Sequence, residues 1–152
     1  MTRTDLPPGL AGLPLDHVAI AVEDLDAATR SWTLLGAVAA GEDERVEGQG
    51  VLVRTLRLGG TLLELLEPLD EASPVARFME RRGAGLHHVA LRVHDVEATL
   101  YGLLAEGALA IDAAPRPGRA GTRVVFLHPR WTGGVLVELV EHTCATAGDG
   151  DE

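Results

Sequence analysis

The sequence predicts an α+β fold made of two tandem β-α-β-β-β modules. The first observation is an internal repeat, in which LDHVAIAV at 15–22 returns as LHHVALRV at 86–93, an offset of 71 residues. The second is a pair of matched closing segments, TLLELLEP at 61–68 and VLVELVEH at 135–142, an offset of 74. A period of about 70 residues is too long for a solenoid repeat. Two copies of one module are therefore the better interpretation.

Each module opens with a strand and a helix. The two copies of the first repeat are alternating or apolar runs, which are typical of strands. Asp24 and Asp95 follow them, and a carboxylate at this place can accept the free N–H groups of a first helical turn. Apolar residues then recur every three or four positions as far as Gly36 and Gly107. Glycine suits the left-handed residue that follows a helix, so we expect both helices to end there.

Three further strands complete each module. We expect them near 37–46, 51–58 and 61–67 in the first module and near 108–114, 122–128 and 134–142 in the second. Between the modules, Ser73 can cap a short helix that has Pro74 at its first position, so a linker helix is expected at 73–83.

One domain with two curved sheets results from these elements. It covers 14–143, with the first module at 14–70 and the second at 86–143. We expect residues 1–13 to be a flexible lead-in and the acidic residues 144–152 to be a disordered tail.

Composition argues against several kinds of partner. The chain has 152 residues and is 46% hydrophobic, enough for a sizeable core. Its formal net charge of −10 opposes binding to a phosphate backbone, and 3% aromatic residues offer few stacking platforms for bases. No stretch approaches the roughly 20 apolar residues of a membrane span. We therefore expect a soluble, cytoplasmic protein that binds neither nucleic acid nor membranes. Its single cysteine, Cys144, permits no intramolecular disulfide and no thiolate zinc site.

The repeat places the same polar residues at matched positions of both modules. His17 and His88 lie in the first strands, and Glu64 and Glu138 lie in the last strands. A single glutamate there could face solvent by strand alternation, and a single histidine could be structural. A buried carboxylate, however, needs a partner charge. Because both residue types recur in both modules, we expect the four to converge on a divalent metal, for which imidazole and carboxylate ligands suit Mn²⁺, Co²⁺, Fe²⁺ or Zn²⁺.

These segments resemble the vicinal oxygen chelate superfamily, which includes the glyoxalases, and within it the methylmalonyl-CoA epimerases. The similarity rests on LDHVAIAV, on GTLLELLEP with SPVARFMERRGAGLHHVALRV, and on GTRVVFLHP with GGVLVELVE, and it covers most of 15–142. The histidine patterns are shared across the superfamily, whereas the later segments are more characteristic of the epimerases. The resemblance implies a glyoxalase-like fold in which the paired modules form a metal-centred cleft.

The resemblance also implies a ligand set and a reaction. The metal ligands would be His17, Glu64, His88 and Glu138, where the family has either Gln or Glu at the position of Glu64. The ion would be divalent, with Co²⁺ or Mn²⁺ favoured over Zn²⁺, Mg²⁺, Fe²⁺ or Ni²⁺. The substrate would be an acyl-CoA, and (R)- and (S)-methylmalonyl-CoA would be interconverted by abstraction of the C2 proton, a metal-stabilised enolate and reprotonation on the opposite face. Ethylmalonyl-CoA stays open as a substrate, and a homodimer is implied.

Two catalytic residues are expected from the same resemblance. Without a gap, the family's catalytic glutamate falls on Gly48 of RVEGQGVLV. A one-residue slip in this loop would place Glu47 there instead, so Glu47 is the candidate for one acid/base role and the metal-bound Glu138 for the other. The alternatives are that Glu47 is a solvated acid in an acidic segment, or that another residue takes its role.

Residues around the ligands have more than one interpretation. His87 should face away from His88 by strand alternation and is expected to support the site rather than bind metal. His128 is expected to brace the turn before the last strand. Three arginines could meet coenzyme A phosphates or the substrate carboxylate, or could be ordinary surface residues: Arg119, Arg123 and Arg130.

Two other kinds of protein remain as alternatives. One is another metal enzyme of the superfamily. A ring-cleaving dioxygenase would use two histidines and one carboxylate, so the fourth candidate, Glu64, argues against it. The FLHP…GGVLVEL ending favours an epimerase over a glyoxalase. The other alternative is a non-enzymatic protein that binds small molecules, which would generally lack the metal ligands and often have an aromatic cleft. Only two Trp, one Tyr and two Phe are present here.

Overall fold

The computed structural model of the protein describes residues 12–142. In this part of the chain, nine strands form one mixed sheet in the order β2-β4-β5-β1-β6-β9-β8-β7, with β3 paired to β4. The strands are β1 (Leu15–Ala21), β2 (Val38–Ala39), β3 (Glu44–Val46), β4 (Val51–Leu58), β5 (Thr61–Pro68), β6 (Gly85–Arg92), β7 (Arg116–Pro117), β8 (Arg123–Leu127) and β9 (Val137–Glu141). The helices are α1 (Leu25–Leu34), α2 (Pro74–Arg82) and α3 (Val96–Ala105), with short 3-10 turns η2 (Glu47–Gln49) and η3 (Arg119–Gly121).

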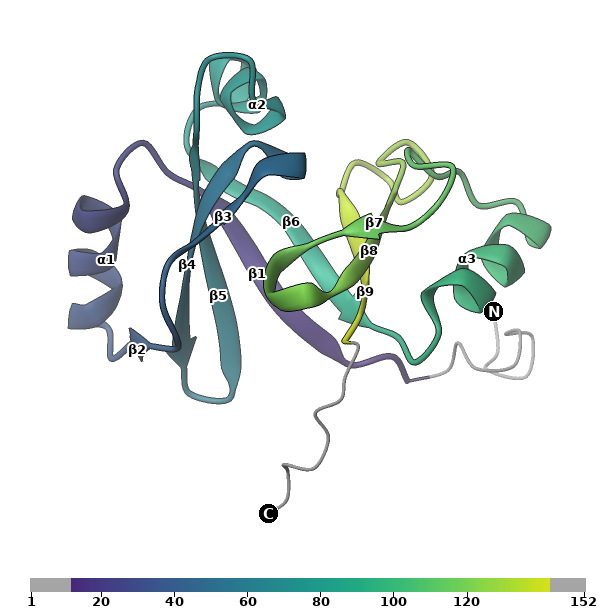
Figure 1. Ribbon diagram of the computed structural model, residues 1–152, viewed down its shortest axis with the longest axis horizontal. Helices are drawn as coiled ribbons and strands as arrows, with labels where there is room; N and C mark the ends of the chain where they lie inside the picture. The colour runs from purple at the N-terminus through teal and green to yellow at the C-terminus, as the bar shows by residue number, and fades with distance from the viewer. Residues whose placement is uncertain (1–11, 143–152) are drawn as a thin grey trace.

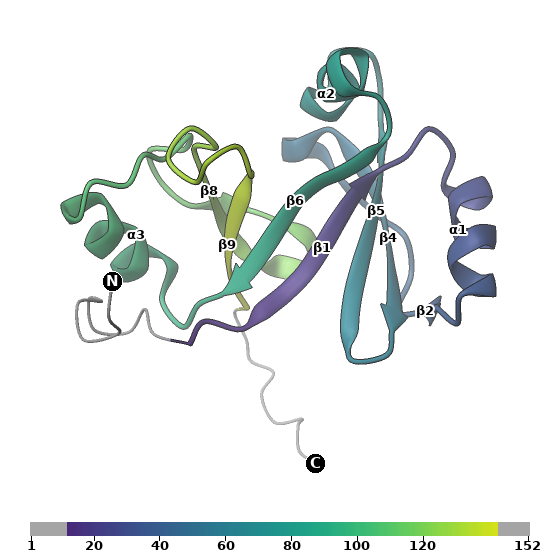
Figure 2. The same ribbon diagram turned by 180° about the vertical axis from the view of Figure 1, so that it is seen from behind.

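The two modules are joined through their equivalent first strands. β1 and β6 run antiparallel, with Val18 opposite Val89, and each also pairs in parallel with the last strand of its own module. Figures 1 and 2 show this pair crossing the middle of the molecule, with α1 and α3 on the outer flanks and α2 at one end. The sheet is therefore continuous, which corrects the expectation of two sheets. Each first strand has a second edge whose N–H and C=O groups need partners, and the other module supplies them.

Several expected strands are shorter than the apolar pattern indicates. The strand expected at 37–46 is divided into β2 and β3 near Gly41, which has a φ of 96°. Of the strand expected at 108–114, one bridge between Ala110 and Leu127 is present, followed by the two-residue β7. Pro115 follows the expected strand and Pro117 lies in β7, and proline has no N–H to donate to a strand ladder.

Both module helices start as their sequences predict. Asp24 and Asp95 accept hydrogen bonds from backbone N–H groups of the first turns of α1 and α3. A second carboxylate reaches each helix from the last strand of the same module: Glu67 accepts from the N–H of Leu25 at 2.9 Å, and Glu141 makes the equivalent bond to α3 at 2.9 Å. Because Glu67 and Glu141 match at the 74-residue offset, both modules contain the same helix-to-sheet hydrogen bond.

Strand alternation separates an outer apolar face of the sheet from an inner face. Leu63 and Leu65 of β5 pack in the core under α1, and Leu139 of β9 packs in the core under α3. Their neighbours Glu64 and Glu138 must then point to the inner face, because successive side chains of a strand alternate. None of the helices between residues 12 and 142 is long and apolar enough to cross a membrane. The expected lead-in, the acidic tail and Cys144 lie outside the described residues, apart from the end of the lead-in.

Candidate metal centre

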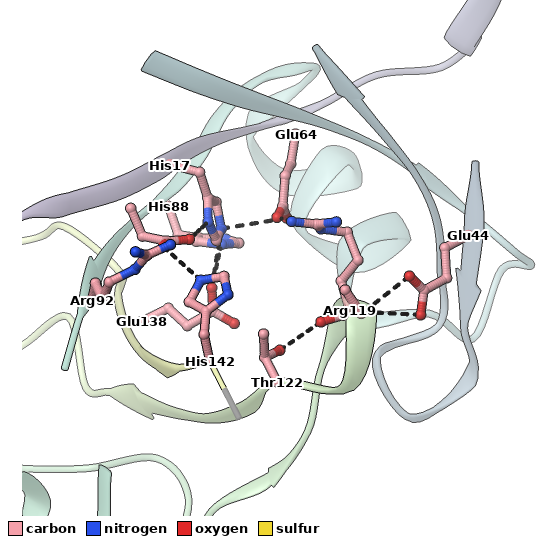
Figure 3. A network of polar contacts seen from close by, with 11 residues as sticks. His17, Glu44, Glu64, His88, Arg92, Arg119, Thr122, Glu138 and His142 are labelled. Atoms are coloured by element: carbon pink, nitrogen blue, oxygen red, sulfur yellow. Dashed lines mark hydrogen bonds and ion pairs between the residues drawn. The ribbon is translucent and has the colours of Figure 1, made fainter. Parts of the chain in front are cut away.

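The four predicted ligands meet on the inner face of the sheet. His17, Glu64, His88 and Glu138 come from β1, β5, β6 and β9, which are the four neighbouring strands at the centre of the sheet. Nε2 of His17 lies 3.3 Å from Oε1 of Glu64 and 3.2 Å from Oε1 of Glu138. Nε2 of His88 lies 3.2 Å from the same Glu138 oxygen. All four side chains are buried, and Figure 3 shows them directed toward one point.

The atoms of this cluster fit a divalent cation. Ligand atoms of His17, His88 and Glu138 all lie within 4.8 Å of one another. Both Nε2 atoms are buried and have no hydrogen-bond partner in the described structure, although carboxylate oxygens are near. A buried polar atom without a partner is rare and costly, and a bound cation would satisfy both nitrogens at once. Glu64 is positioned to add a fourth ligand through Oε1.

Asp16 fixes the orientation of His17 by a hydrogen bond at the ring nitrogen that faces away from the cluster. Its carboxylate accepts a hydrogen bond from Nδ1 of His17 at 2.7 Å, and further bonds from Nε2 of His142 at 2.7 Å and Nε of Arg92 at 3.1 Å. Burial alone would raise the pKa of Asp16, but the hydrogen bonds from His17 and His142 hold that pKa well below its usual range. A proton on Nδ1 leaves Nε2 of His17 with its lone pair toward the cluster, which is the tautomer that a metal ligand needs.

His87 supports His88 in the equivalent place. The Nδ1 atoms of His87 and His88 lie 2.9 Å apart, and the His87 ring meets Phe78 edge-on with centroids 4.7 Å apart. Burial, together with the charge of His88, lowers the pKa of His87 to about 4, so His87 is neutral near pH 7 and can accept from Nδ1 of His88. The 71-residue offset matches Asp16 with His87, so each precedes a candidate ligand histidine at the same place in its module. This match is the feature of the sequence from which both supporting residues could have been recognised.

The expectation that His87 faces away from His88 is wrong. The pairing of β1 with β6 shifts register at this point, since Ala19 lies opposite His88 while Ile20 lies opposite Leu86. One residue of β6 is thereby left out of the ladder, as in a β-bulge. The bulge breaks strict alternation and allows both rings to approach each other.

The residues of the cluster shift one another's pKa values strongly. Burial acts to lower the pKa of His17, but the hydrogen bond to Asp16 and the carboxylates of Glu138 and Glu64 raise it to about 10. Burial acts to raise the pKa of Glu138, but the close imidazoles of His17 and His88 and their charges lower it to about 2. The negative charge of the buried carboxylates is therefore neutralised in part by a proton on His17, and a divalent cation would neutralise it more completely.

Two spaces adjoin the cluster. The smaller, of about 10 Å³, is bordered by His17, Glu64, Arg119, Thr122 and Glu138 among others. The larger is a cavity of about 560 Å³ whose walls include both apolar and basic side chains. Its lining includes His87 and His88, the apolar side chains of Leu66, Val75, Phe78 and Phe126, and the basic side chains of Arg81, Arg82 and Arg116.

The remaining candidates from the sequence have different surroundings. Glu47 lies in η2 with its side chain 72% exposed, where it accepts from Nε of Arg45 at 2.9 Å. Gln49, two residues later, borders both spaces beside the cluster. The catalytic role of Glu47 stays a prediction. Nδ1 of His128 accepts from the backbone N–H of Arg130 at 3.0 Å, as expected for a residue that braces this turn.

The three candidate arginines are not equivalent. Arg119 is at the cluster, where its Nε donates to Oε2 of Glu64 at 3.0 Å. Arg123 instead pairs with Glu97 of α3 at 3.1 Å, and Arg130 is exposed. Neither Arg123 nor Arg130 is among the residues that line the two spaces described above.

The family assignment follows from comparison with known proteins. The family model described as the Glyoxalase/Bleomycin resistance protein/Dioxygenase superfamily matches residues 16–126, which is more than half of the chain. The chain belongs to this superfamily. Within it, the chain is 43% identical to the ethylmalonyl-CoA/methylmalonyl-CoA epimerase of Cereibacter sphaeroides over 129 residues, which cover 82% of this chain and 95% of the relative. The glyoxalase-like fold expected from the paired modules is confirmed.

Solved structures of the superfamily agree with this placement. The crystal structure of methylmalonyl-CoA epimerase from Mycobacterium tuberculosis matches with a TM-score of 0.83 at 37% identity, covering 91% of this chain and 93% of that one. A variant of the Streptomyces coelicolor methylmalonyl-CoA epimerase in complex with 2-nitronate-propionyl-CoA matches with a TM-score of 0.81 at 34% identity, covering 87% and 99%. The predicted resemblance to the epimerase branch of the superfamily is therefore confirmed.

Proposed function

We propose that this chain is a metal-dependent epimerase that interconverts (R)- and (S)-methylmalonyl-CoA. The observation that supports this most directly is the convergence of His17, His88 and Glu138 within 4.8 Å, beside a cavity of about 560 Å³. Relatives that are named as methylmalonyl-CoA epimerases, at 37% and 43% identity, support the choice of substrate. Ethylmalonyl-CoA belongs to the same proposal, because the Cereibacter sphaeroides relative is named for both acyl groups.

The proposed metal ligands are His17, Glu64, His88 and Glu138. A set of two imidazoles and two carboxylates favours Co²⁺ or Mn²⁺, with other divalent ions as weaker candidates. When bound there, the ion supplies electrophilic stabilisation for negative charge that develops on a thioester oxygen. Within the chain, Asp16 and His87 hold the two imidazoles in the tautomer that leaves Nε2 free.

Epimerisation needs a proton acceptor or donor on each side of C2. We assign these roles to Glu138 and Glu47. Glu138 is ionised at neutral pH, since its pKa is lowered to about 2, and its position in β9 places it at the cluster. Glu47 would have to release Arg45 and turn toward the larger cavity that Gln49 already borders. Gly48 and the left-handed Gly50 (φ of 68°) flank Gln49 and give this segment the backbone freedom for such a turn.

The larger cavity is the proposed acyl-CoA site. Its apolar walls, including Val75 and Phe78, can pack against the acyl and thioester part of the substrate. Arg81 and Arg82 at the end of α2 are suited to the phosphates of coenzyme A, because guanidinium groups bind phosphate with paired hydrogen bonds. We further propose, from the family resemblance, that the protein works as a homodimer in the cytoplasm.

The direct test is exchange of the C2 proton of methylmalonyl-CoA in deuterium oxide, followed by NMR. With Co²⁺ or Mn²⁺ added, the protein should exchange this proton promptly, and treatment with a chelator should stop the exchange. A metal-loaded protein that leaves C2 unexchanged, under conditions where a known epimerase is active, would remove the proposal.

The same assay tests the acid/base role proposed for Glu47. Glu47→Gln should keep its bound metal and lose turnover by roughly a hundredfold or more, as expected when a positioned acid/base is removed. Glu42→Gln, an equivalent change at an exposed site in the same acidic segment, is the matched control. Turnover of Glu47→Gln close to that of the control would show that another residue is the acid/base.

A further inference from the structure

The guanidinium of Arg119 contacts the oxygen of Glu64 that faces away from His17. Its Nε donates to Oε2 of Glu64 at 3.0 Å, while Oε1 of the same carboxylate lies 3.3 Å from Nε2 of His17. Glu64 thus turns one oxygen toward the cluster and the other toward Arg119. The side chains of Arg119 and Glu64 are only 22% and 8% exposed, so water screens their attraction weakly.

Hydrogen bonds to the backbone of η3 hold Arg119 beside Glu64. The hydroxyl of Thr122 donates to the carbonyl of Arg119 at 2.8 Å, and the N–H of Ala120 donates to both carboxylate oxygens of Glu44 in β3, at 3.0 and 3.1 Å. Ala120 has a φ of 56°, a left-handed conformation that is costly for a residue other than glycine. Contacts from both modules therefore stabilise a strained turn whose effect is to direct Arg119 at the cluster.

Arg119 does not border the space proposed for the acyl group. It borders the space of about 10 Å³, which can hold roughly one water molecule. It is not among the residues that line the cavity of about 560 Å³. Because its contact at the cluster is with Glu64, we treat Arg119 as a positioning residue that acts through this carboxylate.

The charges around the cluster indicate what this residue does. The carboxylates of Glu64 and Glu138 would cancel the charge of a divalent cation, so Arg119 leaves the site with one net positive charge. A malonyl-type thioester brings one free carboxylate and develops further negative charge when C2 is deprotonated. With Glu64 present and Arg119 absent, the free carboxylate would already meet a neutral site, and the charge that develops on deprotonation of C2 would be added to a site with one net negative charge.

We infer that Arg119 and Glu64 form a compensating charge pair that makes the site selective for acyl-CoAs with a free carboxylate. The inference rests on the proposed function, since it takes the cluster as a metal site and the ligand as an acyl-CoA. Arg119 neutralises the negative charge of Glu64 and keeps Glu64 bound through one oxygen. A neutral amide at 64 would need no such partner, so substitutions at the two positions should compensate each other.

The test measures binding of two ligands to cobalt-loaded protein by calorimetry. Malonyl-CoA carries the free carboxylate and has no stereocentre, whereas acetyl-CoA lacks the carboxylate. Arg119→Gln should weaken malonyl-CoA binding by roughly tenfold or more and leave acetyl-CoA within about twofold of wild type. The double variant Arg119→Gln/Glu64→Gln should regain malonyl-CoA affinity to within about threefold of wild type, because the pair is again neutral. Arg30→Gln on the exposed side of α1 is the matched control.

The outcomes separate this inference from the proposed function. Wild-type protein that takes up no cobalt would refute the metal site itself. If wild type loads cobalt, the inference is overturned by an Arg119→Gln variant that binds malonyl-CoA as wild type does, or by a double variant that is as weak as Arg119→Gln. Loss of cobalt from Arg119→Gln supports the inference if Glu64→Gln restores it in the double variant and overturns it otherwise.

Discussion

Three of the four candidate ligands depend on a neighbour that orients them. Nδ1 of His17 bonds to Asp16, Nδ1 of His88 bonds to His87, and Oε2 of Glu64 bonds to Arg119. These bonds hold the free nitrogen or oxygen of each ligand toward the shared point. Partners of this kind determine ligand basicity as well as orientation, so their loss should weaken the site without removing any ligand.

Asp16→Asn tests this dependence. The amide can still accept a hydrogen bond from Nδ1 of His17, but it carries no charge and would leave Arg92 and His142 with a weaker partner. We expect Co²⁺ affinity to fall by roughly tenfold to a hundredfold while the ligand set stays intact. Calorimetric titration with Co²⁺ measures this, with Asp70→Asn at an exposed loop as the control. An unchanged dissociation constant would refute the role assigned to Asp16.

At the residue scale, the repeat predicted the ligands better than their neighbours. Matched positions in two pairs of apolar strands were enough to select the four ligand candidates. Arg119 could be recognised only as one of three arginines in a glycine-rich stretch, because its contact with Glu64 spans 55 positions and depends on a left-handed turn at Ala120. A single sequence gives no signal for such a turn at alanine.

The elements differ in how strongly their sequences define them. Capping residues and glycines located α1 and α3, and a Ser-Pro pair located α2, because these signals act over a few residues. The pairing of β1 with β6, in contrast, is a contact between modules that no local pattern specifies. The shortened strands around β2 and β7 were missed because proline and left-handed glycine outweigh an apolar pattern.

Arg54 of β4 connects several elements of the first module by hydrogen bonds, and these bonds bear on the stability of the protein at low pH. Its guanidinium donates two hydrogen bonds to Asp43, at 2.9 and 2.8 Å, and others to Asp26 and Thr29 of α1. The hydrogen bonds from Arg54 lower the pKa of Asp43 below its usual value. A folded-state pKa below the unfolded value of about 3.9 adds stability above that pH, and this stability is lost as the pH falls.

Asp43→Asn should therefore lower the free energy of unfolding by about 0.5–1 kcal/mol at neutral pH, a small effect because Asp43 is partly exposed. The difference from wild type should shrink as the pH falls through about 4 and below. Urea unfolding of metal-free protein at several pH values checks this, with Glu42→Gln as the control. A difference that stays the same at low pH would contradict the ionic origin of the effect.

In the whole molecule, duplication accounts for the location of the site. The two first strands pair at the centre, so each module brings its last strand alongside, and β5-β1-β6-β9 become neighbours. Four side chains at matched positions then meet on one face. The sequence allowed this convergence to be predicted from the repeat alone. It did not allow the contact between the η3 turn and Glu44 to be predicted, because that contact joins η3 of the second module to β3 of the first and has no counterpart in the repeat.

Metal stoichiometry is the measurement that decides whether both halves of the chain share one metal site. Equilibrium dialysis against Co²⁺ should give one ion per wild-type chain. His17→Ala and His88→Ala should each abolish that binding, whereas His94→Ala, at an exposed position, should retain it. Two ions per chain, with one remaining after either ligand histidine is removed, would mean separate sites in the two modules and would rule out a shared site.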